Sequence, residues 1–169
     1  MPSSFKDEFM NVEIVERPEI MAAVIRIPRN GQLVREAWAQ AATWLQDNQA
    51  VADREHGYVF IPEWQWATEV TTLWVGVPVN HTEGLPAGLV TIKLPARRYA
   101  KLTVQGDRAH MEEAYSRLFD WFEQGPFVRD TQEGSYGFEA NRLHPVNPFD
   151  IPADEINAFD YDIYAPIMD

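Results

Sequence analysis

The run VEIVERPEIMAAVIRI, residues 12–27, has the composition of a strand and is interrupted by Pro18. We predict one strand over this run, with Pro18 as an interruption because proline lacks the N–H that a strand ladder needs. Beyond it, apolar residues recur every three or four positions over residues 32–48, which predicts an amphipathic helix. Two more strands are predicted at residues 58–64 and 68–79. The first half of the chain therefore has the order strand, helix, strand, strand.

The second half of the chain repeats this order. GLVTIKLPARRYAKLTVQ, residues 88–105, is again a strand-like run interrupted by a proline, Pro95. A helix is predicted at residues 109–124, and strands are predicted at residues 136–143 and 160–167. The chain is thus predicted to contain two units of the same kind in tandem.

Fixed offsets in residue number relate individual residues of the two halves. An offset of 77 relates Pro18 to Pro95, Trp38 to Tyr115, Trp44 to Trp121 and Leu45 to Phe122. An offset of 78 relates Tyr58 to Tyr136 and Phe60 to Phe138, and an offset of 88 relates Pro78 to Pro166. Because these matches occur in order and in matching elements, they predict a duplicated β-α-β-β unit.

We predict an α+β fold in which residues 1–169 form one domain, with pseudo-repeats at about 12–80 and 87–167. Each unit supplies one helix and three strands, which is too little for a core of its own. Together the units would form one antiparallel sheet with both helices on one face. The opposite face, where the halves meet, would be left as a central groove, and clefts of this kind are common ligand sites.

Composition limits the classes of function. The chain has 26 acidic and 14 basic residues and a net charge of −12, which disfavours nucleic-acid binding because phosphate contacts need clustered Lys and Arg. It has no cysteine, and its four histidines lack metal-ligand spacing. No secretory signal or membrane-spanning run is evident. We therefore expect a cytoplasmic protein with no metal and no other cofactor.

Glu139 stands within SYGFEANRL, residues 135–143, which otherwise has the pattern of a half-buried strand. At the offset of 78, its counterpart in the first half is Ile61. A carboxylate on the solvent-facing side of a strand is common, since Glu is rarely buried without a partner. A position with a purely structural role would be expected to keep its polarity in both halves. Here an apolar residue in one half corresponds to a carboxylate in the other. The residues alone leave open whether Glu139 is a surface charge or points into a site.

Aromatic residues make up 12% of the chain and supply candidate ring contacts for a ligand. Trp64 and Trp66 are two positions apart, so on an extended segment both rings would face the same side. Alternation along the strand places Tyr136 on the face opposite Glu139. The candidate ligand-binding residues are Glu139, Asn141, Trp64, Trp66, Trp74, Phe60, Tyr136 and Tyr164.

Five segments resemble, in order, the GyrI-like (gyrase-inhibitor-like) effector-binding domain: VEIVERPEIMAAVIRI, LWVGVPV, LPARRYAKLTVQGD, GFEANRL and DIYAPI. That domain occurs in AraC-type and MerR-type multidrug regulators and as stand-alone proteins. The resemblance covers about residues 12–167 and implies tandem SHS2-like units around a pocket for hydrophobic, often cationic, molecules. It also implies that Glu139 is the glutamate that points into this pocket. The family often has an aromatic residue two positions later, where this chain has Asn141.

The resemblance and the candidate residues together predict a small-molecule-binding protein. Aromatic rings offer cation–π attraction and Glu139 offers the opposite charge, so we expect a hydrophobic, cationic ligand. Burial should raise the pKa of Glu139, and cation binding should then weaken as the pH falls. With only about ten residues before the first strand, no helix-turn-helix is expected, and no direct contact with nucleic acid or membrane.

Two alternatives stay open. Some stand-alone members of the resembling family hydrolyse electrophilic molecules by opening strained rings. In this chain Glu139 would then activate water, with Tyr136 or Tyr164 assisting. Gyrase inhibitors indicate instead a protein-interaction module, and a protein partner or a homodimer fits that class. We prefer the binding function without turnover.

Overall fold

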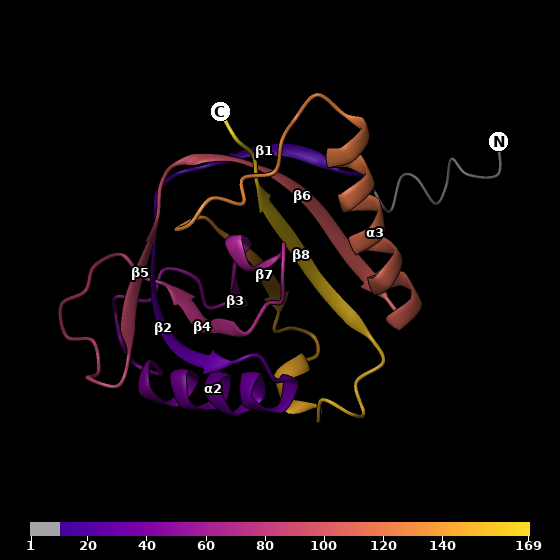
Figure 1. Cartoon of the computed structure of the whole chain (residues 1–169). Helices are drawn as coiled ribbons and strands as arrows, with labels where there is room; N and C mark the ends of the chain where they lie inside the picture. Colours follow the sequence, from indigo (N-terminus) through magenta and orange to yellow (C-terminus); the bar gives the residue numbers. More distant parts are fainter. Residues whose placement is uncertain (1–10) are drawn as a thin grey trace.

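The computed structural model describes residues 11–169, which form an α+β fold with one curled antiparallel sheet of eight strands (Figure 1). The strands are β1 (Glu13–Arg17), β2 (Ile20–Pro28), β3 (His56–Pro62), β4 (Thr72–Pro78), β5 (Val90–Leu94), β6 (Arg97–Gly106), β7 (Tyr136–Arg142) and β8 (Phe159–Pro166). The helices are α2 (Gly31–Trp44) and α3 (Arg108–Gln124), with short 3-10 helices η1 (Glu63–Gln65) and η2 (Pro148–Asp150). None of the helices in this described part is long and apolar enough to cross a membrane.

The sheet has a two-fold pseudo-symmetric strand order, β1-β6-β8-β7-β3-β4-β2-β5. If β1–β4 and β5–β8 are taken as equivalent sets, the order is the same from either end. The registers agree as well: Glu13 of β1 faces Lys101 of β6, and Val90 of β5 faces Val24 of β2. The offset of 77 converts one pair into the other. The sheet is therefore built from two equivalent halves, as the sequence predicts.

Each half contributes four strands, whereas three were predicted. Pro18 separates β1 from β2, and Pro95 separates β5 from β6. Because proline cannot donate to a strand ladder, each run ends there and the chain turns a corner. The short strand before each corner then pairs with the other half, β1 with β6 and β5 with β2. The two halves are thus joined by exchanged strands.

The fourth strands confirm the predicted offset of 88. Ala22 of β2 faces Pro78 of β4, and Tyr99 of β6 faces Pro166 of β8. Ala22 and Tyr99 are equivalent positions at the offset of 77. Their partners Pro78 and Pro166 are therefore equivalent too.

The third strands correct the predicted offset of 78. Tyr58 of β3 faces Gly76 of β4. Phe138 of β7 faces Tyr164 of β8, which is the equivalent of Gly76 at the offset of 88. Tyr58 therefore corresponds to Phe138, and an offset of 80 relates the two strands. Each strand has two aromatic residues two positions apart, so an offset of 78 also matches aromatic residues with aromatic residues.

The correction changes the counterpart of Glu139. At the offset of 80 it is Val59, and the predicted counterpart, Ile61, is wrong by two positions. Val59 and Glu139 also face each other in the ladder between β3 and β7, so the pseudo-two-fold axis passes between them. A shift of two positions leaves every side chain on the same face of a strand. The counterpart of Glu139 is accordingly still apolar.

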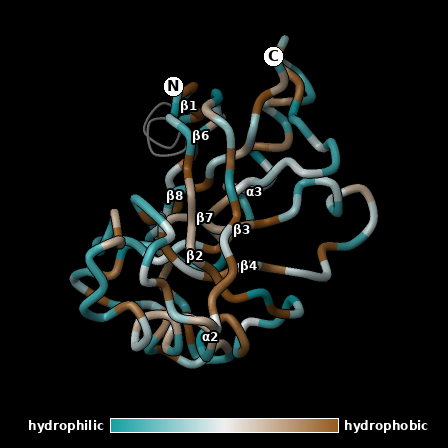
Figure 2. The backbone as a smooth tube through the Cα atoms, turned by 90° about the vertical axis from the view of Figure 1, so that its left-hand side faces the viewer, coloured by the Kyte–Doolittle hydropathy of each residue, from teal (hydrophilic) through white to brown (hydrophobic). Residues whose placement is uncertain are grey.

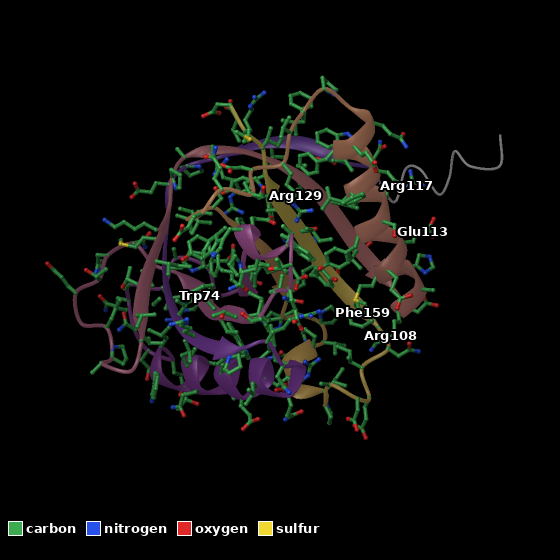
Figure 3. The ribbon with its side chains drawn as sticks, viewed as in Figure 1. Trp74, Arg108, Glu113, Arg117, Arg129 and Phe159 are labelled. Atoms are coloured by element: carbon green, nitrogen blue, oxygen red, sulfur yellow. The ribbon has the colours of Figure 1, made fainter. Side chains whose placement is uncertain are left out.

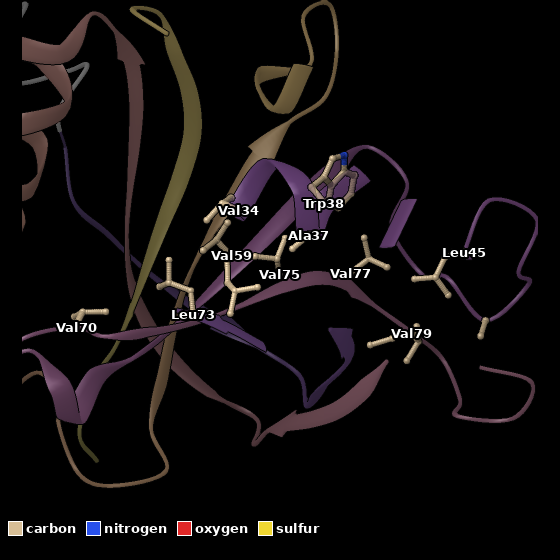
Figure 4. Packing of buried hydrophobic residues seen from close by; sticks show 13 residues of the cluster. Val34, Ala37, Trp38, Leu45, Val59, Val70, Leu73, Val75, Val77 and Val79 are labelled. Atoms are coloured by element: carbon tan, nitrogen blue, oxygen red, sulfur yellow. The ribbon is translucent and has the colours of Figure 1, made fainter. Parts of the chain in front are cut away.

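Both helices pack on one face of the sheet, as predicted. Helix α2 covers β2 and β4, where Ala37 and Trp38 pack against Val59 and Val75 (Figure 4). Helix α3 covers β6, where Leu118 packs in a second apolar cluster. Apolar stretches follow the strands and the inner side of α2, whereas polar residues prevail in the loops (Figure 2). The helix face therefore holds two separate cores, one under each helix.

The opposite face is a third core and not the predicted groove. Phe60 and Phe138 are at most 1% exposed there, with ring centroids 5.5 Å apart. Leu94 of β5 and Tyr99 of β6, on either side of the corner at Pro95, pack on the same cluster. Because the sheet curls at those corners, its large aromatic side chains meet each other and fill this face. The groove was predicted on the wrong face.

Candidate functional site

A cavity of about 660 Å³ lies on the helix face, between the two helices and over β3 and β7. Its charged lining residues are Arg29, Arg35, Glu69 and Glu139. Its larger apolar and aromatic lining residues include Val34, Val59, Ile61, Val70, Leu73, Met111, Tyr115, Phe149, Ile156, Phe159, Tyr161 and Trp66. The site is thus an apolar cleft with a few charged groups, the usual composition of a small-molecule site.

The floor of the cavity is formed by two equivalent pairs of residues. Val59 and Ile61 of β3 correspond, at the offset of 80, to Glu139 and Asn141 of β7, and all four line the cavity. Alternate residues of a strand face the same side, which is why each pair projects together. Asn141 is held in place by its Nδ2 group, which donates to the carbonyl of Gly57 at 3.3 Å. One half of the floor is therefore apolar and the other half polar.

Glu139 is the polar centre of this floor. The hydroxyl of Tyr115, from α3, donates to its Oε2 atom, and the hydroxyl of Tyr161, from β8, donates to that of Tyr115 at 3.2 Å. Burial raises the pKa of Glu139 to about 7, and the positive charge of Arg29 acts in the opposite direction. Burial, and then the neighbouring Glu139, raise the pKa of the Tyr161 hydroxyl. The carboxylate therefore changes its charge near neutral pH.

The N-terminal end of α2 forms one wall of the cavity. The side chain of Asn30 accepts hydrogen bonds from the backbone N–H groups of Gln32 at 2.9 Å and Leu33 at 3.0 Å, so the helix begins here. This start places Val34 and the two arginines beside the cavity. The Nη1 group of Arg35 donates to the Gly31 carbonyl at 2.9 Å, which holds that guanidinium against the helix.

Three of the eight predicted site residues line this cavity: Glu139, Asn141 and Trp66. Phe60, Trp74, Tyr136 and Tyr164 belong to the core on the opposite face. Trp64 packs edge-on against Tyr136, with centroids 5.3 Å apart, and so faces that side too. The structure does not bring these five residues to the cavity that contains Glu139.

Trp64 and Trp66 point apart because their segment is not extended, contrary to the prediction. It is the 3-10 helix η1, Glu63–Gln65, and Trp66 is the C-cap residue that follows it, still in a helical conformation. A helix of about three residues per turn separates positions i and i+2 by roughly 240°. Trp66 therefore faces the cavity while Trp64 faces Trp74, at a centroid distance of 6.5 Å.

Sequence reasoning missed the partners of Glu139. Tyr115 has the spacing of a core residue on its helix, and nothing local indicates that its hydroxyl reaches a carboxylate. Tyr161 could have been found, because Glu139 faces Ile163 in the ladder and Tyr161 lies two positions away on the same face. Phe159, at the start of β8, lies beside Arg108 of α3, far from Trp74 (Figure 3). Finding the position of Tyr161 requires the register between strands, and finding the contacts of Tyr115 and Arg108 requires the packing of α3 on the sheet.

Between residues 11 and 169 the structure has no group of three or more His, Asp or Glu residues placed to hold a metal ion. The carboxylates of the cavity, Glu69 and Glu139, are accompanied by two arginines instead. The chemistry that this arrangement supports is charge pairing, hydrogen bonding and proton exchange at Glu139.

The comparisons with known proteins agree with a small-molecule site. The model of the GyrI-like small molecule binding domain matches residues 10–139 of the chain, a range that ends at Glu139. The chain belongs to the GyrI-like family. A search of curated protein sequences gave no match for this GyrI-like chain. Its membership makes it a small-molecule-binding domain at the level of the family.

Solved structures share the fold of this GyrI-like chain at low sequence identity. The C-terminal domain of EcmrR is 13% identical, with a TM-score of 0.68, and the match covers 94% of this chain and 97% of that one. SAV2435 bound to tetraphenylphosphonium is 11% identical, with a TM-score of 0.63 and coverage of 94% of both chains. A hydrolase from Listeria innocua is 10% identical, with a TM-score of 0.58 and coverage of 98% of both.

Proposed function

We propose that the chain binds a hydrophobic organic cation in the cavity between α2 and α3, with Glu139 as the anionic partner. The observation that carries this proposal is a single carboxylate at the centre of the floor of an otherwise largely apolar cavity of about 660 Å³. The other acidic lining residue, Glu69, is exposed to solvent. A ligand that fills the apolar space therefore meets one buried carboxylate on the floor, with Arg29 and Arg35 at the wall beside the start of α2.

The physical basis of the affinity is the desolvation of Glu139. Burial raises its pKa to about 7, so the empty site holds a carboxylate that is only half ionised near neutral pH. A cation within contact distance favours the ionised form, and Coulomb attraction is stronger at a desolvated carboxylate than in bulk solvent. The rings of Tyr115, Phe149, Phe159 and Trp66 can add cation–π contacts of about 0.5–2 kcal/mol each. The solved structure of SAV2435 bound to tetraphenylphosphonium is the reason to test this cation first.

The proposal is tested by titrating the protein with tetraphenylphosphonium while following tryptophan fluorescence. We expect Glu139→Gln to weaken binding of this cation by about tenfold or more, since a buried charge pair is lost. A neutral molecule of similar size, triphenylphosphine oxide, should bind the variant and the unchanged protein alike. Glu69→Gln is the matched control and should change neither affinity. Equal affinity of Glu139→Gln and the unchanged protein for the cation would contradict the proposal.

The affinity for a cation should also depend on pH. With a pKa of about 7, Glu139 is mostly protonated at pH 6 and mostly ionised at pH 8. We expect affinity for tetraphenylphosphonium to fall about tenfold from pH 8 to pH 6, in proportion to the ionised fraction. Binding by the Glu139→Gln variant should be flat over this range. A similar pH dependence in both proteins would show that a different group governs binding.

A second candidate function is hydrolysis of an electrophilic small molecule. The chain of hydrogen bonds from Tyr161 through Tyr115 to Glu139 favours it, because a carboxylate with a raised pKa beside tyrosine hydroxyls suits proton transfer. Ionised Glu139 would take a proton from water as the water oxygen bonds to an electrophilic ring carbon. The ring bond would break, and its departing atom would take up the proton that Glu139 had received from water. Tyr136 and Tyr164, which the sequence predicted to assist Glu139, lie on the opposite face of the sheet.

The two candidate functions predict different outcomes when the protein is incubated with reactive compounds. Incubation with a panel of strained-ring electrophiles followed by mass spectrometry should show, for an enzyme, a product heavier by one water. Glu139→Gln should abolish that product. A binding protein would return each compound unchanged while still showing saturable fluorescence quenching.

A further inference from the structure

Glu63, in the 3-10 helix η1, is a fully buried carboxylate at 1% exposure. The guanidinium of Arg129 meets it with two hydrogen bonds, Nη2 to Oε1 at 3.1 Å and Nε to Oε2 at 3.2 Å. Burial raises the pKa of Glu63 to about 6, and the charge and hydrogen bonds of Arg129 oppose this rise. A buried ion pair adds little stability because desolvation offsets the attraction, although it fixes geometry well. The pair therefore calls for a role other than stability.

Trp66 is the third member of this group. The Arg129 guanidinium lies 5.2 Å from its ring centroid, and the neighbouring Trp66 side chain helps Arg129 to oppose the rise in the pKa of Glu63. Trp66 lines the cavity, whereas Glu63 and Arg129 are not among the described lining residues. The ion pair thus contacts the indole from behind the cavity wall. Figure 3 shows Arg129 near the C-terminal end of β8. Its backbone forms an isolated antiparallel β-bridge with Ile167.

The strand that carries Glu139 also makes room for this group. A Cβ atom on Gly137 would overlap the Oε1 atom of Glu63 and lie 2.9 Å from the carbonyl oxygen of Tyr164. Gly137 is two positions before Glu139, so both are on the same face of β7. On the α3 side, Phe122 lies 5.8 Å from the Arg129 guanidinium. Elements from both halves of the chain therefore hold Arg129 and Glu63 in one place.

We propose that the Glu63–Arg129 pair is a positioning device that fixes the indole of Trp66 in the cavity wall and so makes the site selective for ligands that carry a flat aromatic ring. This inference rests on the proposed small-molecule function. Trp66 is 43% exposed, so without the pair its ring is free to turn away from the cavity. A fixed ring loses less conformational entropy when a ligand ring packs on it. An aliphatic ligand of the same charge gains less from that surface.

The test compares two phosphonium ions of equal charge, tetraphenylphosphonium with four rings and tetrabutylphosphonium with none. We expect Arg129→Leu to weaken tetraphenylphosphonium binding about 5- to 30-fold, the size of one or two well-placed aromatic contacts, with little change for tetrabutylphosphonium. The double variant Glu63→Leu/Arg129→Leu should show the same loss. It leaves no unpaired buried charge, so it keeps the measurement available if the single variant does not fold. Arg129→Lys, which keeps the charge but not the two-pronged geometry, should recover part of the affinity.

The matched control is a neighbouring ion pair, between Arg97 of β6 and Asp130, the residue that follows Arg129. Arg97 and Asp130 meet at 2.7 Å, with side chains 13% and 11% exposed, and no described contact joins them to Trp66. Arg97→Leu/Asp130→Leu should therefore leave the ratio of the two affinities unchanged. The proposal is wrong if Arg129→Leu binds both ions as the unchanged protein does. It is equally wrong if both ions are weakened by the same factor, since the pair would then support the whole cavity.

A spectroscopic measurement separates this inference from the proposed function. The indole N–H resonance of Trp66, assigned by its loss in Trp66→Phe, should shift in Arg129→Leu and stay in place in the Arg97→Leu/Asp130→Leu control. If the unchanged protein binds neither phosphonium ion, the proposed function fails. The resonance then still decides whether the pair positions the ring: a shift supports positioning, and an unchanged resonance overturns it.

Discussion

At neutral pH Glu139 lowers the stability of the folded protein, although the proposed ligand binding depends on it. Its pKa of about 7 in the folded protein is above the ordinary value of 4.5, so the folded state binds a proton more readily than the unfolded chain. The stability linked to this group is fully present below pH 4.5 and is lost as the pH rises to about 7. We expect Glu139→Gln, which cannot ionise, to be more stable than the unchanged protein above pH 7, by about 1–3 kcal/mol. Urea unfolding at a series of pH values measures this difference.

The same series contains its own control. Below about pH 4.5 the carboxyl is protonated in both states, so the advantage of Glu139→Gln should disappear. The pKa of Glu63 is also raised, to about 6. Because Glu63 is present in both proteins, its effect on stability cancels in the comparison. An advantage that does not change with pH would show that packing, and not ionisation, separates the two proteins.

Gly137 is required by what lies against it. A side chain there would overlap the carboxylate of Glu63, which cannot move without breaking its hydrogen bonds to Arg129. We expect Gly137→Ala to lower the free energy of unfolding by about 1–3 kcal/mol, as overpacking does. In a Glu63→Ala background the added cost should be smaller, which a double-mutant cycle by thermal unfolding would detect. Costs that simply add would mean that the nearby carbonyl of Tyr164 is the obstacle.

Side-chain orientation could be predicted from the sequence only where the strand was regular. Alternation correctly separated Glu139 from Tyr136, and it survived an error of two positions in the offset because the period of a strand is two. It failed for Trp64 and Trp66, since nothing in PEWQWATE specified a 3-10 turn in place of an extended segment. The contact between Tyr115 and Glu139 joins a helix to a strand, and no local pattern encodes such a distance.

At the level of the elements, the two helices begin in the same way. Asn30 caps α2, and Asp107, its equivalent at the offset of 77, caps α3 by accepting from the His110 N–H at 3.0 Å. We expect Asn30→Ala and Asp107→Ala each to lower the free energy of unfolding by about 1 kcal/mol, the usual cost of losing a cap. Chemical denaturation of the two variants measures both costs. A loss at only one helix would show that the other start is fixed by packing.

The order of helices and strands was predictable, but their long-range pairing was not. Amphipathic periodicity gave both α-helices within a few residues, and the prolines marked where strands stop. Neither signal indicates that β1 pairs with β6, because the partners Glu13 and Lys101 are far apart in the chain. The same limitation put the groove on the wrong face, since the curl of the sheet follows from these exchanged strands.

For the whole molecule, the exchanged strands predict that neither half folds alone. Residues 1–86 would lack the partner of β1, and residues 87–169 would lack the partner of β5. Each half would also expose the edge of its third strand, which in the full chain is covered by the other half. We expect each fragment by itself to show little cooperative unfolding by circular dichroism. Mixed or co-expressed, the two fragments should associate and recover the β-rich spectrum of the full chain.

The cut lies in the segment between Asn80 and Leu89, which contains no strand or helix. It therefore removes no hydrogen-bonded ladder by itself. A fragment that unfolds cooperatively without its partner would contradict this account and would make the halves independent domains.

The pseudo-two-fold axis between Val59 and Glu139 has a bearing on how such a site can arise. In a symmetric dimer of half-length chains, a residue on the axis meets its own copy. A glutamate there would set two carboxylates opposite each other with Cβ atoms about 4.5–5.5 Å apart, and one of them would stay protonated. A valine there would leave no charge at all. Covalent fusion of the halves removes this restriction, so a glutamate that faces an apolar residue at the centre of the cavity is open to a single long chain and closed to a symmetric dimer of half-length chains.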